Sequence, residues 1–209
     1  NYPRPFHPTA IDDLVRNSQP SKPGRVEYRG GFEFGMHNAG HIPGAVMFDF
    51  PQQEFLFTGD IHTVDTQLTR AVKPKPCRTL AIESTYGGRE HPKRGEVESE
   101  LVDSIEDVVN SGGKVVLPSF GLGRSQELLM LTRDLGFEVW LDGMGRDIAR
   151  ILQKHPGSIR DTRAMNKAFK STNFVKYGRQ RKAALHGDII VTTSGMLNGG
   201  PVLHYLSKL

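Results

Sequence analysis

The chain has 209 residues, a formal net charge of +4, 37% hydrophobic residues and a mean hydropathy of −0.41. This length suffices to bury a core without disulfide bonds, and no stretch approaches the roughly 18 apolar residues of a membrane span. A lone Cys77 excludes an internal disulfide and a cysteine-based zinc cluster, and we expect a cytoplasmic protein with no membrane segment.

The charge is unevenly distributed along the chain. Residues 1–142 carry 15 basic and 20 acidic side chains, whereas residues 143–209 carry 12 basic and 3 acidic ones. A stretch this basic suits a polyanion such as RNA, because each neutralised phosphate releases counterions. A solvated protein surface has the same composition, so charge alone leaves both interpretations open.

The first part of the chain predicts a short helix followed by antiparallel hairpins. Helical spacing indicates a helix at 9–17, and alternating apolar residues predict strands at 25–34, 45–50 and 54–59. Glycines and a proline supply the turns between these strands. A proline-rich linker at 73–77 leads to a further apolar run, which ends in the carboxylate of Glu83.

The later part alternates between predicted helices and strands. Helices are expected at 96–110, 125–135, 146–155 and the C-terminal residues, with strands at 114–120, 138–143 and 188–194. Such alternation with short loops is typical of parallel βαβ units, so two architectures should meet near residue 80. The chain opens without Met and stops inside an apparent helix, and we expect it to be part of a longer protein.

Two polar residues of the first part are candidate metal ligands. His41 lies in the loop sequence HNAGHIPG, and Asp60 follows the strand sequence FLFTG. An imidazole and a carboxylate can together bind a divalent metal, although one His and one Asp also often form a simple polar pair.

A glycine-containing turn, SFGLGR at 119–124, is a candidate phosphate site. Arg124 could bind a phosphate there or pair with a carboxylate such as Glu127. The turn lacks the third glycine of a dinucleotide fingerprint and the lysine of a P-loop, which argues against an ATP or NAD site. Ser194 and Gly195 follow another predicted strand, at the same carboxyl edge of a parallel sheet.

Five motifs in order carry a family resemblance: AGHIPGA, FTGDI, IESTYGGREHP, PSFGLGRSQELL and VTTSGMLNGGPVLHYL. Together they resemble the β-CASP branch of the metallo-β-lactamase superfamily. They are most similar to archaeal RNA-processing enzymes related to the cleavage and polyadenylation specificity factor nuclease, with ribonuclease J as a more distant relative. The resemblance implies an α/β fold. Residues 1–80 would form part of a metallo-β-lactamase αββα domain, and residues 81–209 would form most of a parallel-sheet β-CASP domain.

The resemblance also implies residue roles. His41 matches a metal ligand, Asp60 matches the aspartate that bridges two zinc ions, and Glu83 matches the acidic residue that orients a later active-site histidine. RNA contacts are implied for positions facing the cleft between the domains and for the basic stretch: Ser119, Arg124, Ser194, Gly195, Arg179, Arg181 and Lys182.

The chain also departs from the family pattern. The defining H-x-H-x-D-H loop, which supplies most zinc ligands, is absent and should precede Asn1, and the later histidines should follow Leu209. Two protein ligands leave a zinc ion underfilled, so we expect the chain alone to be inactive. Any homodimer contacts should likewise involve segments outside this chain.

The resemblance therefore implies a zinc-dependent ribonuclease that acts in mRNA 3′-end processing or RNA turnover. Its activity would be endonucleolytic, with 5′-to-3′ exonucleolytic activity as a further expectation. The alternative is a non-catalytic RNA-binding or scaffold subunit, although retention of His41, Asp60 and Glu83 argues against it. A small-molecule hydrolase is a third interpretation, but it would have no need of the second domain.

Overall fold

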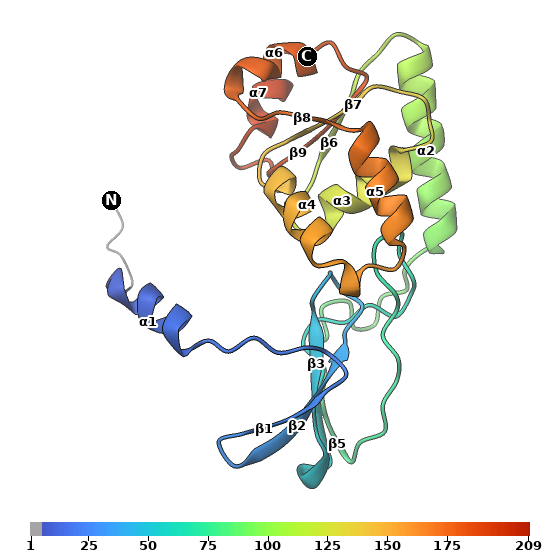
Figure 1. Ribbon diagram of the computed structural model, residues 1–209. Coiled ribbons are helices and arrows are strands. Elements are labelled where there is room, and N and C mark those ends of the chain that lie inside the picture. The colour runs from blue at the N-terminus through green and yellow to red at the C-terminus, as the bar shows by residue number, and fades with distance from the viewer. Residues whose placement is uncertain (1–5) are drawn as a thin grey trace.

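The computed structural model describes residues 6–209 and contains two separate β-sheets, the five-stranded one below and the four-stranded one above in Figure 1. Helix α1 (Thr9–Asn17) projects away from both sheets, and none of its residues is buried. Among the described residues, no helix is long and apolar enough to cross a membrane.

The first sheet has the strand order β1-β2-β3-β4-β5. Its strands are β1 (Val26–Arg29), β2 (Phe32–Asn38), β3 (Val46–Phe50), β4 (Phe55–Phe57) and β5 (Thr79–Ala81). Strands β1 to β4 pair antiparallel, which confirms the predicted hairpins, and β5 joins β4 in parallel. Gly30 and Gly31 both have positive φ, as a two-residue hairpin turn requires.

The second sheet has the order β6-β9-β7-β8, and all its strands are parallel. Its strands are β6 (Val115–Pro118), β7 (Val139–Asp142), β8 (Asn173–Phe174) and β9 (Ile189–Thr192). The helices around it are α2 (Arg94–Asn110), α3 (Arg124–Thr132), α4 (Gly145–Lys154), α5 (Thr162–Ser171), α6 (Arg181–Ala184) and α7 (Val202–Leu206). The predicted α/β fold class is thus confirmed.

Helices cover both faces of the second sheet. On the central strand β9, Ile189 and Val191 join the core built with α2 to α5, whereas Ile190 packs with Tyr205 of α7 on the opposite face. A parallel strand buried on both faces has a continuous apolar sequence, as here. The apolar run at 114–120 predicts a buried strand, but β6 is only half-buried because it lies at the edge of the sheet.

Helix α5 occupies a region to which the sequence pattern assigned no element. Its N-cap is Asp161, whose carboxylate accepts a hydrogen bond from the Ala164 amide at 2.8 Å. Met165, Ala168 and Phe169 are spaced to lie on one helix face, and all three are buried in the core. The basic residues between them face outward and obscure this pattern in the sequence.

The segment between β4 and β5 of the first sheet is anchored in the second core. Leu68 is 1% exposed and belongs to the same hydrophobic cluster as α3 and α5. The buried carboxylate of Glu127 accepts hydrogen bonds from the amides of Gln67 at 2.6 Å and Leu68 at 2.9 Å, and it also pairs with Arg94 at 2.7 Å. These contacts fix the segment between β4 and β5 against α3.

Candidate active site

The two predicted metal ligands lie together at one end of the first sheet. His41 follows β2, Asp60 follows β4, and the His41 Nε2 and Asp60 Oδ2 atoms are 3.9 Å apart. The two loops are joined by a β-bridge between Gly40 and Ile61 and by a hydrogen bond from the His62 amide to the Ala39 carbonyl at 3.0 Å.

Gly40 makes this close crossing of loops feasible. Its φ is +75°, and a Cβ atom there would lie 2.5 Å from the His62 carbonyl oxygen and 2.8 Å from the Val72 amide nitrogen. Any side chain at this position would therefore push the loops apart. The motif AGH thus combines a candidate ligand with the glycine that positions it.

The His41–Asp60 pair fits part of a zinc site. Imidazole nitrogen and carboxylate oxygen are suitable zinc donors, and both side chains are accessible, with Asp60 69% and His41 39% exposed. Among residues 6–209, however, no group of three or more His, Cys, Asp or Glu side chains is arranged to hold a metal. The described residues therefore offer two candidate ligands, fewer than a zinc ion needs.

Glu83 joins this site through the Asp60 loop. Its carboxylate accepts a hydrogen bond from the Ile61 amide at 2.8 Å. Hydrogen bonding from the Thr85 side chain, and then from the Ile61 amide, holds the pKa of Glu83 below its ordinary value, with a smaller contribution from His41. Glu83 is therefore ionised at neutral pH, as a residue that orients a histidine should be.

The turns after β6 and β9 also meet. A Cβ atom at Gly195 would lie 3.1 Å from the Ser119 carbonyl carbon, so these turns are in direct backbone contact. The Ser119 hydroxyl is buried and lies 2.9 Å from the Ser125 hydroxyl, and the exposed Arg124 begins α3. The structure thus brings Ser119, Arg124 and Gly195 together around one cavity of about 360 Å³.

Ser194 and Arg124 differ in how they are engaged. The Ser194 hydroxyl donates to the Asn198 side-chain oxygen at 3.0 Å. The carboxylate of Glu127, the alternative partner predicted for Arg124, is occupied by Arg94 and by backbone amides.

The three basic residues near α6 have different surroundings. Arg181 forms an ion pair with the buried Asp142 at 2.6 Å, and the Tyr205 hydroxyl donates to the same carboxylate at 2.9 Å. Arg179 lies over the Tyr177 ring, 5.4 Å from its centroid, and Lys182 is exposed. Arg181 therefore has a structural partner, whereas Arg179 and Lys182 lie at the surface.

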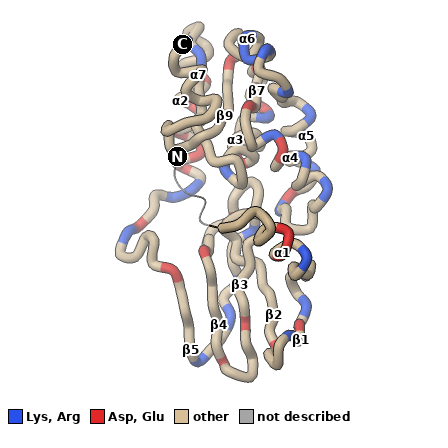
Figure 2. Tube along the Cα trace, turned by 90° about the vertical axis from the view of Figure 1, so that its left-hand side faces the viewer, with Lys and Arg blue, Asp and Glu red and all other residues tan. Residues whose placement is uncertain are grey.

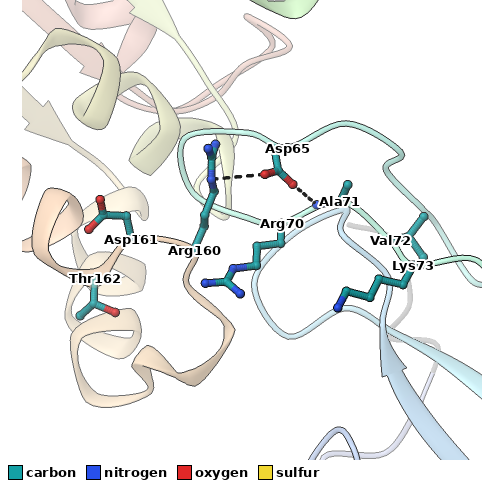
Figure 3. Close-up of a pocket in the computed structure, with 8 residues that line it drawn as sticks. All are labelled: Asp65, Arg70, Ala71, Val72, Lys73, Arg160, Asp161 and Thr162. Atoms are coloured by element: carbon teal, nitrogen blue, oxygen red, sulfur yellow. Dashed lines mark hydrogen bonds and ion pairs between the residues drawn. The ribbon is translucent and has the colours of Figure 1, made fainter.

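A second cavity, of about 680 Å³, lies between the segment that joins β4 to β5 and the start of α5. Figure 3 shows Arg70 and Lys73 extending toward it from the segment that also packs behind Gly40. Arg160 lines the same cavity but pairs with Asp65 at 3.5 Å. Figure 2 shows that many basic residues of the C-terminal part lie along α4, α5 and α6.

Sequence reasoning missed several residues that shape this region. The sequence indicates Glu127 only as a partner for Arg124, and it gives no sign that Asp142 is buried beneath Arg181. The partners of these carboxylates lie far away in the sequence, so no local pattern identifies them. Gly40 is part of the AGH motif, and its position directly before the candidate ligand is a sequence signal for a tight loop.

Comparison with known proteins supplies the family. The chain is 30% identical to the Probable RNase MJ4 of Methanocaldococcus jannaschii, with 97% of the chain and 50% of the relative covered. It is 36% identical to RNase aCSPSF2 of Saccharolobus solfataricus, with 83% of the chain and 37% of the relative covered. The Transcription termination factor FttA of Methanocaldococcus jannaschii is 33% identical over 83% of the chain and 31% of its own length.

The chain belongs to the same family as these archaeal RNases. The resemblance suggested by the five motifs is thus confirmed, although a comparison with models of known protein families gave no match. The chain spans about half the length of MJ4 and about a third of the length of the other two relatives. Within that span it includes the His41–Asp60 site and the turns that face it.

Proposed function

We propose that the full-length protein is a zinc-dependent ribonuclease that hydrolyses RNA phosphodiester bonds in mRNA 3′-end processing or RNA turnover. The observation that carries the proposal is the convergence of His41, Asp60 and Glu83 at one end of the first sheet, in a homologue of proteins named as RNases. These residues come from three separate loops, and the backbone contacts around Gly40 hold two of the loops together.

Each residue has a role that follows from its surroundings. His41 and Asp60 present a nitrogen and an oxygen donor on the same side, which suits them to hold zinc with ligands from outside the described residues. Bound zinc would supply Lewis acidity toward the phosphate and activate the attacking water. Asp60 is accessible and would offer two carboxylate oxygens to bridge two ions.

The remaining residues would bind the RNA or orient other groups of the active site. Glu83 accepts hydrogen bonds from the Ile61 amide, which fixes the loop bearing Asp60, and from Thr85, and its ionised carboxylate would orient a histidine. Arg124 would bind an RNA phosphate next to Ser119 and Gly195. Arg179 and Lys182 would add further phosphate contacts on the side of α6. Endonucleolytic and 5′-to-3′ exonucleolytic activity and a homodimer remain parts of this proposal.

The alternative is a non-catalytic RNA-binding subunit. It is favoured by the lack of a third metal ligand near His41 and Asp60 within residues 6–209. One experiment separates the two: zinc content by elemental analysis and RNA cleavage, measured on the same sample of the full-length protein and on the 209-residue chain. About two zinc ions per full-length chain and cleavage by that sample alone would support the nuclease. RNA binding without zinc or cleavage would support the scaffold.

A further inference from the structure

The cavity of about 360 Å³ beside Arg124 has walls suited to an aromatic ligand. It opens between α2, the turn after β6 and α3, and apolar side chains from all three form its walls, among them Val97, Leu101, Phe120 and Leu128. Its volume falls in the range of sites for small organic groups. The cavity can therefore accept a flat apolar group of modest size.

Phe120 is the most unusual part of this wall. Its side chain is 57% exposed, although it lies in a turn whose neighbouring residues Ser119 and Ser125 are buried. The Gly195 backbone packs directly against the Ser119–Phe120 peptide, which fixes the position of this turn. An exposed aromatic ring on a fixed backbone is a ready surface for stacking.

The charges around the cavity leave one cation uncommitted. Arg94 pairs with Glu127 at 2.7 Å and also with Glu98, so this guanidinium is fully engaged and the three groups together keep one negative charge. Arg124 forms no ion pair with any other residue of the described range 6–209. An aromatic face beside an uncommitted guanidinium is the combination that binds one nucleotide, with its base on the ring and its phosphate on the cation.

The cavity is linked to the His41 loop. Gly123 has a φ of +83°, and a Cβ atom there would lie only 2.8 Å from Ile42 Cγ2. Ile42 directly follows His41, and Arg124 directly follows Gly123. The turn that carries Phe120 and Arg124 therefore packs against the loop that carries the candidate metal ligand.

We propose that this cavity is a nucleobase subsite, in which a base of single-stranded RNA stacks on Phe120 while the adjoining phosphate binds Arg124. The inference rests on the proposed ribonuclease function and assigns to Phe120 a positioning role in it. Because the contact is a ring face against apolar walls, it should accept different bases with little preference. The subsite would hold the RNA backbone beside the His41–Asp60 pair.

The test measures RNA binding by the full-length protein in an Asp60→Ala background, which prevents cleavage during the measurement. The probe is a short, fluorescently labelled oligouridylate, used with and without an abasic nucleotide in the sequence. The variants are Phe120→Ala, Phe120→Trp and the control Met144→Ala. Met144 is 64% exposed and touches the same turn at Gly121, but it does not line the cavity.

Phe120→Ala should weaken binding about ten-fold and leave the salt dependence unchanged, because a stacking contact releases no counterions. Phe120→Trp should restore the affinity, and Met144→Ala should leave it unaltered. Arg124→Ala should instead lower the slope of log K against log salt by about 0.7. With the abasic probes, the difference in affinity between the parent protein and Phe120→Ala should be smallest when the abasic nucleotide occupies the subsite.

Equal affinity of the parent protein and Phe120→Ala for the intact oligouridylate would overturn the subsite. A weakening by Met144→Ala as large as that by Phe120→Ala would overturn it as well. Neither result touches the proposed ribonuclease function, which fails only if the protein without any substitution does not cleave RNA. The two failures are therefore distinguishable.

Discussion

The two sheets differ in how well their faces are covered. In the four-stranded sheet, β9 is buried along its whole length by helices on both sides. In the five-stranded sheet, one face packs Met47 and Leu56 against the segment that includes Val72, whereas the other carries partly exposed aromatic rings. Phe34, Phe48 and Phe50 lie on that second face with centroids 6.1 Å apart in two pairs.

This difference teaches where stability and chemistry lie. Most of the buried hydrophobic residues belong to the second sheet and its helices. The candidate ligands, by contrast, lie on accessible loops of the first sheet. Residue contacts join the two regions: the Ile42–Gly123 packing, Leu68 in the second core and the hydrogen bonds to Glu127. The second region thus provides the support against which the first region positions its polar groups.

The largest expected effect is on chemistry alone. Asp60→Ala or His41→Ala in the full-length protein should lower RNA cleavage about 10³-fold, because each removes a proposed zinc ligand and the bound ion would supply several kcal/mol of transition-state stabilisation. RNA affinity and the thermal midpoint should hardly change, since both side chains are accessible.

The measurements are cleavage rate, RNA affinity and zinc content, with Glu100→Ala on the exposed side of α2 as the control. Unchanged cleavage in Asp60→Ala would refute the metal assignment.

The next effect is on the connection between the regions. Glu127→Ala removes the shared acceptor of the Gln67 and Leu68 amides and leaves Arg94 with Glu98 as its remaining ion-pair partner, and it should lower the free energy of unfolding by about 3 kcal/mol. Urea denaturation of this variant beside Glu100→Ala gives the comparison. A loss no larger than that of Glu100→Ala would mean that Glu127 does not tie the two regions together.

A third prediction separates two roles within the basic stretch. Arg181→Ala removes the ion-pair partner of the buried Asp142 carboxylate. This loss should lower the free energy of unfolding by about 2 kcal/mol. The double charge reversal of Arg179 and Lys182 should leave stability nearly intact, yet weaken RNA binding and flatten its salt dependence. If the salt slope is unaltered in the double variant, these residues do not contact phosphate. If Arg181→Ala has the same urea midpoint of unfolding as the parent protein, the ion pair with Asp142 does not stabilise the fold.

Local patterns predicted much of this molecule, and their failures have a common cause. Alternation and turn residues located the hairpins around Gly30 and Pro51, and helical spacing located α2, α3 and α4. The helix α5 was missed because basic residues interrupt the apolar spacing of Met165, Ala168 and Phe169 in the written sequence. Its N-cap Asp161 was a signal that could have identified it.

The candidate site was predictable to the extent that motifs carry it. The order of the motifs named His41, Asp60 and Glu83, and the structure brings all three to one end of a sheet. The roles of Glu127 and Asp142 could not be read from the sequence. Their partners lie tens of residues away and meet them only after the parallel sheet has formed. Long-range polar contacts of this kind depend on topology rather than on spacing.

The smallest expected effect tests whether surface contacts also stabilise the second region. The carboxylate of Asp134, just after α3, accepts a hydrogen bond from Lys167 of α5, and this contact holds the pKa of Asp134 below its usual value of 3.8. A lowered folded pKa means that the ionised group stabilises the fold above the unfolded value, and that this contribution is lost as the pH falls through the folded value. Asp134→Asn should therefore lower the thermal midpoint by no more than about 2 °C at pH 7, because exposed ion pairs are weak. The difference should vanish in acid and shrink in high salt. A midpoint shift as large as that of Glu127→Ala would show that exposed ion pairs hold α3 and α5 together as strongly as the buried carboxylate holds the two regions.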